Sequence, residues 1–190
     1  MGIEILSQSA GVLDVAAIKQ HIRVEYDDED TIIEGMADAA VGWFENRCNI
    51  SIAHTHYALT VNAFPHEGNR SIRLPRPPSI TVGQITYADP EGEEQTLPAE
   101  AYRLDATVRP GRVIPLRPWP ATTDEPGRIR IQYEAGFTSA NDLPPLLRQG
   151  LYLLVGHWYE NRAATADREA KQVPFALDSI VERFRYPEIA

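Results

Sequence analysis

Apolar residues recur at helical spacing in two parts of the chain that lie far apart in the sequence. The stripes fall on residues 14–22 and 30–48 near the beginning, and on residues 142–163 and 176–185 near the end. A repeat of three to four residues places apolar side chains on one face of an α-helix. The pattern therefore predicts four helices, and it predicts that residues 161–164 form a solvated exit from the third.

The middle of the chain, residues 53–136, alternates apolar with polar positions and contains most of the prolines and glycines. Alternation with a period of two is typical of half-buried strands, and Gly or Pro between such runs marks turns. The sequence DPEG at residues 89–92 predicts one turn, and Pro110 and Gly111 fit the central pair of a type II turn. Successive hairpins predict an antiparallel sheet or a small sandwich.

The order of these segments indicates the fold class. Helices, then strands, then helices predict an α+β fold in which the N- and C-terminal helices form one core. We expect residues 1–52 and 137–190 to build this helical core, and residues 53–136 to form a β-rich insertion. In such a fold, the apolar stripes on the two sides of the insertion face each other.

Charge and cysteine content narrow the range of possible functions. The chain has 27 acidic and 18 basic side chains and a formal net charge of -9, so its surface repels phosphate and lacks the basic face that nucleic acid binding needs. Cys48 is the single cysteine, and we interpret it as a small buried hydrophobe in a protein from a reducing compartment. The beginning of the chain does not read as a signal peptide, and the apolar stretch at 143–159 is too interrupted to span a bilayer.

Two histidines carry the first candidate chemistry. His54 and His56 lie two positions apart in a predicted strand, so their rings share a face as the ligands of a metal would. Zinc or iron would need further ligands, and His66 lies nearby in a predicted loop. One alternative function is therefore a metal-dependent hydrolase that uses His54, His56 and His66. Exposed strand histidines are the simpler interpretation, and we assign no metal ligand.

The remaining polar motifs predict structure and not chemistry. The acidic run at 27–30 lacks the ligand spacing and the central glycine of a calcium loop, and we expect Asp28 or Asp30 to cap the helix that follows. His157 and Glu160 are neighbours on a helical face, but a di-metal bundle would need a second such pair. No nucleophile elbow, phosphate-binding loop or dinucleotide fingerprint is present. We therefore assign no catalytic residue and no cofactor.

The order of several short motifs resembles a known family. These motifs are DDED at residues 27–30, YEAGF at 133–137, GHWYENR at 156–162 and VPFALDSIVERFR near the end of the chain. Together they resemble the head–tail connector proteins of tailed bacteriophages, in the longer subgroup with a β insertion between the helices. The resemblance covers residues 12–185, and one departure is Gly156, where the family pattern has alanine.

The resemblance implies a structural protein of the virion, located at the head–tail junction after synthesis in the cytoplasm of the bacterial host. Such connectors assemble as a ring, typically dodecameric, beneath the portal protein, and they dock the next neck or tail-completion protein. DNA passes through the ring without specific binding, which suits the net negative charge. The family has no catalytic residue, no cofactor and no membrane partner.

A second alternative function is a binding module outside any phage particle. The β-rich insertion would then recognise a ligand in a pocket lined by four aromatic residues, namely Tyr57, Tyr87, Tyr102 and Trp119. A polar segment at 162–172, RAATADREAKQ, is expected to become ordered only when a partner docks. The sequence leaves open which residues line the channel or form the contacts between subunits.

Overall fold

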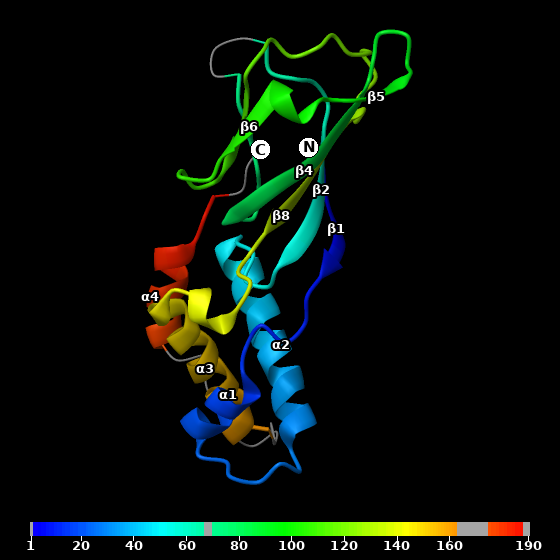
Figure 1. Cartoon of the computed structure of the whole chain (residues 1–190). Coiled ribbons are helices and arrows are strands. Elements are labelled where there is room, and N and C mark those ends of the chain that lie inside the picture. The colour runs from blue at the N-terminus through cyan, green and yellow to red at the C-terminus, as the bar shows by residue number, and fades with distance from the viewer. Residues whose placement is uncertain (1, 67–69, 163–174, 188–190) are drawn as a thin grey trace. The chain divides into compact units, whose positions relative to one another are not determined.

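The computed structural model of the chain describes residues 2–66, 70–162 and 175–187. Most of the segment expected to order on docking, residues 163–172, lies outside these described residues. Two compact units are present, and Figure 1 labels their helices and strands. A helical unit contains described residues of 9–53 and 137–186, and a β unit contains described residues of 2–8 and 54–136.

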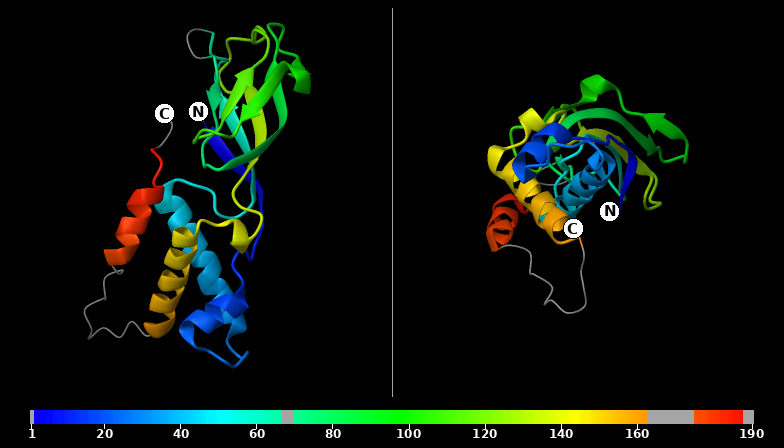
Figure 2. Two further views of the ribbon diagram at one scale, coloured as in Figure 1. Left: turned by 60° about the vertical axis from the view of Figure 1, so that its left-hand side comes forward. Right: turned by 90° about the horizontal axis from the view of Figure 1, so that it is seen from below.

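Four helices form the helical unit: α1 (Val15–Ile22), α2 (Asp30–Cys48), α3 (Pro145–Glu160) and α4 (Phe175–Phe184). Figure 2 shows α2, α3 and α4 side by side, and α1 packs on α2 and α3. Their buried side chains make one core, in which Ile18, Phe44, Leu151 and Leu177 are each fully buried. The predicted helices and the predicted meeting of the two sets of stripes are therefore confirmed. Among the described helices, none is both long enough and apolar enough to cross a bilayer.

A glycine allows α3 to approach its neighbours closely. A Cβ atom built on Gly150 would lie 2.9 Å from Cζ of Phe44 and 3.2 Å from Cδ1 of Ile180. Contacts this short force neighbouring atoms to move, and a close-packed core resists such movement. Gly150 therefore fixes the packing distance of α3 against α2 and α4.

The β unit consists of two antiparallel sheets, as the alternation predicts. Strand order in the larger sheet is β1-β2-β8-β4-β5, and in the smaller sheet it is β3-β7-β6. The strands are β1 (Gly2–Gln8), β2 (Thr55–Val61), β3 (Ile72–Arg73), β4 (Ser79–Ala88), β5 (Glu94–Thr96), β6 (Tyr102–Asp105), β7 (Arg112–Pro115) and β8 (Ile129–Ala135). Strand β8 lies at the centre of the larger sheet, and its residues alternate between buried and half-buried positions.

Strand β1 was not predicted from the sequence. It pairs antiparallel with β2 from Gly2 opposite Thr60 to Gln8 opposite Thr55, and every one of its residues is exposed. A strand with no buried face lacks the alternation that identifies strands in a sequence. Pairing with a strand about fifty residues away along the chain is what defines β1.

The turn at Pro110 and Gly111 differs from the prediction. The φ angle of Gly111 is not positive, whereas a type II turn requires a positive φ at this position. A different constraint explains the glycine, because a Cβ atom on Gly111 would lie 2.7 Å from the Ser79 hydroxyl oxygen. The turn at residues 89–92 is confirmed, with the amide of Gly92 donating to the carbonyl of Asp89 at 2.9 Å.

Candidate functional site

The acidic run before α2 binds a lysine and does not cap the helix. The Lys19 ammonium, in a residue only 9% exposed, donates to Oδ1 of Asp27 at 2.5 Å and to Oδ1 of Asp30 at 2.7 Å. These bonds raise the pKa of Lys19 and lower the pKa of Asp27. The residue at the N-cap position is Glu29, whose side chain makes no capping bond, so the prediction of Asp28 or Asp30 as the cap is wrong. A nearly buried ammonium needs anionic partners, and the carboxylates serve it instead of the helix end.

Glu29 is held by the end of α3 in an arrangement that we call the Glu29 clamp, formed by Glu29, Tyr159 and Arg162. The Arg162 guanidinium donates from Nη1 to Oε1 of Glu29 at 2.6 Å and from Nη2 to Oε2 at 2.7 Å. It also lies over the Tyr159 ring, 3.9 Å from the ring centre, while the Tyr159 hydroxyl donates to Oε2 of Glu29. The Arg162 bonds, followed by the Tyr159 bond, lower the pKa of Glu29 to about 2, and the carboxylate in turn raises the pKa of Tyr159.

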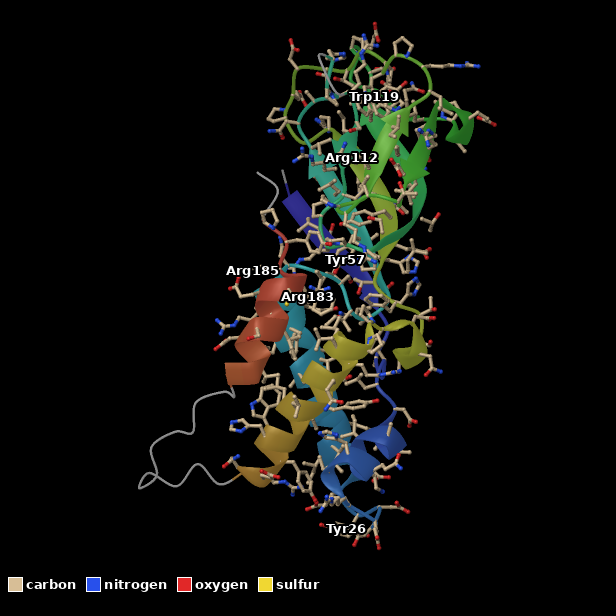
Figure 3. All side chains as sticks on the ribbon, turned by 90° about the vertical axis from the view of Figure 1, so that its left-hand side faces the viewer. Tyr26, Tyr57, Arg112, Trp119, Arg183 and Arg185 are labelled. Atoms are coloured by element: carbon tan, nitrogen blue, oxygen red, sulfur yellow. The ribbon has the colours of Figure 1, made fainter. Side chains whose placement is uncertain are left out.

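The clamp joins the beginning of α2 to the end of α3. Tyr26, labelled in Figure 3 in the loop before α2, adds a hydroxyl 3.2 Å from the Tyr159 hydroxyl. Arg162 is exposed, as the predicted solvated exit requires, and it binds Glu29 from that exposed position. Two residues of the GHWYENR motif thus have a structural task, since a bidentate arginine–carboxylate pair fixes orientation as well as distance.

Other polar groups at the helix ends are also structural. The Asn161 amide donates to the carbonyl of His157 at 2.7 Å at the end of α3. Oε1 of Glu45, which is buried, accepts from the main-chain amides of Ile52 at 2.6 Å and Ala53 at 3.0 Å. Cys48 is fully buried, as predicted, and burial raises the pKa of its thiol to about 11. A thiol with such a pKa is a poor nucleophile at neutral pH.

The four aromatic residues of the predicted binding pocket belong to the core of the β unit. Tyr57 stacks on Tyr133 with ring centres 5.3 Å apart, and Trp119 stacks on Phe64 at 4.6 Å. The Trp119 indole also donates to the carbonyl of Arg70 at 2.8 Å. Tyr57 and Trp119 lie in different parts of the β unit in Figure 3. The aromatic residues therefore pack the core, which does not favour the binding-module alternative.

Tyr87 and Tyr102 complete this set. The Tyr87 ring meets the edge of Phe64, with ring centres 5.9 Å apart. The Tyr102 hydroxyl donates to the carbonyl of Gly83 at 3.3 Å, and the residue is buried. Both side chains are engaged in packing contacts of the β unit.

The outer strand β1 forms an exposed apolar surface. Ile3 is 42% exposed, Ile5 57% and Leu6 43%, on a strand with a neighbour on one side only in the described sheet. A sheet edge with large exposed apolar side chains is a favourable surface for another chain. We call Ile3, Ile5 and Leu6 the β1 surface.

Of the three histidines singled out in the sequence, the fold brings two together and adds a carboxylate. His54 and His56 lie with Glu134 of β8 in a group whose nitrogen and oxygen atoms are all within 4.8 Å of one another. Nε2 of His54 is 3.0 Å from Oε2 of Glu134, and Nε2 of His56 is 3.8 Å from Oε1. His66, which is also described, is not part of this group. Glu134 gives no sequence signal beside the histidines because it lies about eighty residues away from His54 along the chain.

Comparison with known families gives one match. The family described as phage gp6-like head–tail connector protein matches residues 13–96, which include α1, α2 and the first strands after them. Comparison with curated proteins gives no match.

Comparison with solved structures gives matches over the full length. A chain in the neck of an empty gene transfer agent particle, computed with C6 symmetry, is 26% identical, with 100% of this chain and 98% of that chain covered at a TM-score of 0.78. A chain in the virion of a native gene transfer agent particle is 25% identical, with the same coverage and a TM-score of 0.77. A chain in the neck of the native particle, computed with C12 symmetry, is 26% identical, with the same coverage and a TM-score of 0.73.

Proposed function

We propose that this chain is a member of the phage gp6-like head–tail connector family and a structural subunit of a ring at the head–tail junction of a phage or a related particle. The observation that carries the proposal is the agreement with a neck chain over 100% of this chain and 98% of that chain at a TM-score of 0.78. Fold alone does not define function. Agreement that spans both units, together with the family match at residues 13–96, supports the same place in the particle.

We propose twelve subunits in the ring. The neck structures that this chain resembles were computed with C6 and with C12 symmetry. A ring of twelve identical subunits is compatible with both, because a twelve-fold axis contains a six-fold axis. Ring closure also requires two different contact faces on each subunit.

The β1 surface is our candidate for one of these faces. Ile5 alone is 57% exposed, and Ile3 and Leu6 extend the apolar area on the same strand. A neighbouring copy that covers this strand would remove the three side chains from water and would protect the sheet edge.

We further propose that the subunit performs no catalysis. Lys19 and Glu29 are engaged in ion pairs, and Cys48 is buried with a raised pKa, so these groups act in packing. The formal net charge of -9 suits a channel wall along which DNA slides without adhering. The partners in this proposal are the portal protein on one side and the next neck or tail-completion protein on the other.

Light scattering coupled to size-exclusion chromatography tests the ring. We would measure the molar mass at several protein concentrations, with and without purified portal protein from the same particle. Twelve chains of 21.2 kDa would give a ring of about 254 kDa, either alone or on the portal. A mass that stays at that of one chain in every mixture, with no co-elution with the portal, would contradict the proposal.

A further inference from the structure

In the group formed by His54, His56 and Glu134, two residues come from adjacent strands of the β unit, and His54 lies directly before the first of these strands. His56 of β2 lies directly opposite Glu134 of β8 in the antiparallel register, so the two side chains stand on the same face of the sheet. His54 precedes His56 by two positions, and its ring lies on that face as well, 5.3 Å from the ring of His56. Strands β2 and β8 are adjacent in Figure 1, and their pairing runs from Thr55 to Val61. The sheet therefore fixes the positions of His56 and Glu134, and the start of β2 places His54 beside them.

The distances within the group approach those of a metal site. Zinc binds histidine nitrogen and carboxylate oxygen at about 2.0–2.2 Å, so neighbouring ligand atoms in a tetrahedral site are about 3.3 Å apart. In this group Nε2 of His54 lies 3.0 Å from Oε2 of Glu134, and Nε2 of His56 lies 3.8 Å from Oε1, the other oxygen of the same carboxylate. One ligand atom from each of the three residues also lies within 4.8 Å of the other two.

We propose that His54, His56 and Glu134 bind one transition-metal ion of the zinc class. Two imidazole nitrogens and one carboxylate oxygen match the preferences of Zn²⁺, Co²⁺ and Ni²⁺, whereas Mg²⁺ and Ca²⁺ prefer ligand sets made of oxygen alone. From the sequence alone, exposed strand histidines are the simpler interpretation, because a third ligand of suitable type is not evident beside His54 and His56. The register of β2 and β8 brings Glu134 to the histidine pair instead.

Exposure of the three ligands defines the kind of site. The side chains are 28% exposed at His54, 47% at His56 and 31% at Glu134, so an ion can reach them from solvent. Three protein ligands leave at least one coordination position for water or for a side chain of another chain. A bound ion would also link β2 to β8 and stabilise the larger sheet. The proposal rests on these contacts alone and does not depend on the connector function.

Metal titration of the wild-type protein is the direct test. Tag-free protein, treated with a chelator and then desalted, is titrated with Zn²⁺ in a calorimeter and with Co²⁺ in a visible-light spectrometer. We expect saturation at one ion per chain, the absorption spectrum of four-coordinate Co²⁺, and no competition from millimolar Mg²⁺. At a hundredfold excess over the dissociation constant, Zn²⁺ should raise the midpoint of thermal unfolding of the β unit by about 5 °C or more.

Three variants locate the ion. His56→Ala and Glu134→Gln should each weaken Zn²⁺ binding at least about tenfold. His66→Ala, which removes a nearby histidine outside the group, should leave binding unchanged. Circular dichroism before titration verifies that each variant is folded. Absence of Zn²⁺ binding to the wild-type protein would overturn the proposal, and so would equal binding by the wild-type protein and the His56→Ala and Glu134→Gln variants.

Discussion

The elements of the helical unit follow from residues close together in the sequence, whereas the larger sheet of the β unit depends on strands that lie far apart in the sequence. In the helical unit, each element follows from a stripe of apolar residues within its own segment, and the stripes of α2 and α3 meet because both must be buried. In the β unit, strand order is β1-β2-β8-β4-β5, so β2 lies between two strands that are distant from it in the sequence. Periodicity therefore identifies most elements of both units, and local turns pair β4 with β5 and β6 with β7, whereas long-range packing sets the neighbours of β2 and β8.

The first prediction uses a matched pair of phenylalanines to test whether the units unfold separately. Phe44 is fully buried in the helical unit, and Phe64 is 2% exposed in the β unit. Replacing either by alanine removes a large buried ring and should lower the free energy of unfolding of its own unit by about 3–5 kcal/mol.

Two observables distinguish the units during thermal unfolding. In Phe44→Ala, circular dichroism at the helical wavelength should show unfolding of the helical unit at a lower temperature. Calorimetry should show that the transition of the β unit keeps its temperature. Phe64→Ala should give the reverse result. A single transition that shifts by the same amount in both variants would contradict the prediction that the two units unfold separately.

Next in size is a comparison of two glycines in α3. Gly150→Ala should lower the free energy of unfolding by about 1–3 kcal/mol, because its Cβ atom would lie 2.9 Å from Phe44. Gly156→Ala should instead raise it by about 0.5–1 kcal/mol, because its Cβ atom would meet Ile22 at an ordinary 3.4 Å and alanine favours the helix. Urea denaturation of both variants measures the two values, and effects of equal sign would contradict the packing described for Gly150.

A third prediction concerns acid and the Glu29 clamp. The pKa of Glu29 is about 2 in the folded chain, compared with an ordinary value of 4.5. Its contribution to stability is therefore fully present above pH 4.5 and disappears as the pH falls to about 2. Glu29→Gln removes this contribution, so its free energy of unfolding should fall less steeply over that range.

Urea denaturation of wild-type protein and Glu29→Gln at pH 6 and at pH 3 provides the measurement. Other carboxylates with lowered pKa values, such as Asp27, titrate in both proteins and cancel in the comparison. Equal slopes in the two proteins would show that the clamp does not stabilise the helical unit.

The smallest expected effect on stability is at the β1 surface. Ile5→Lys changes a side chain that is 57% exposed, so the free energy of unfolding should change by no more than about 0.5 kcal/mol. If β1 is a contact between subunits, the same change should reduce the amount of ring formed. Leu116→Lys, at an exposed apolar side chain of the β unit outside β1, is the control. A full yield of ring from Ile5→Lys would exclude the β1 surface as a contact.

Much of the fold could be predicted from local pattern. The four helices and the antiparallel character of the middle region follow from apolar spacing, and the core that joins α2 to α3 follows from the need to bury both stripes. Strand β1 could not be predicted, because all of its residues are exposed and no buried face marks it. The sequence could not show why residue 111 is glycine, because a type II turn and a close contact with Ser79 both favour glycine, and the structure has the contact.

Less of the candidate site could be predicted. The histidine pair is visible in the sequence, but Glu134 joins it only through the register of β2 and β8. Glu29 and Arg162 are similarly far apart along the chain, and each read alone is an ordinary surface charge. Two residues that meet only in the tertiary structure leave no local pattern in the sequence, whereas a helix cap or an apolar stripe leaves one.

The division of the helical core between two distant segments affects how the protein is made. Strands β2 to β8 all lie between α2 and α3, so a ribosome completes α2 about a hundred residues before it begins α3. At bacterial rates of 5–20 residues per second, this delay is about 5–20 s. During that time strands β2 to β8 are synthesised, and the apolar face of α2 has no α3 to cover it. Nascent chains of this protein therefore carry an α2 that lacks its α3 partner until the last quarter of the chain is synthesised.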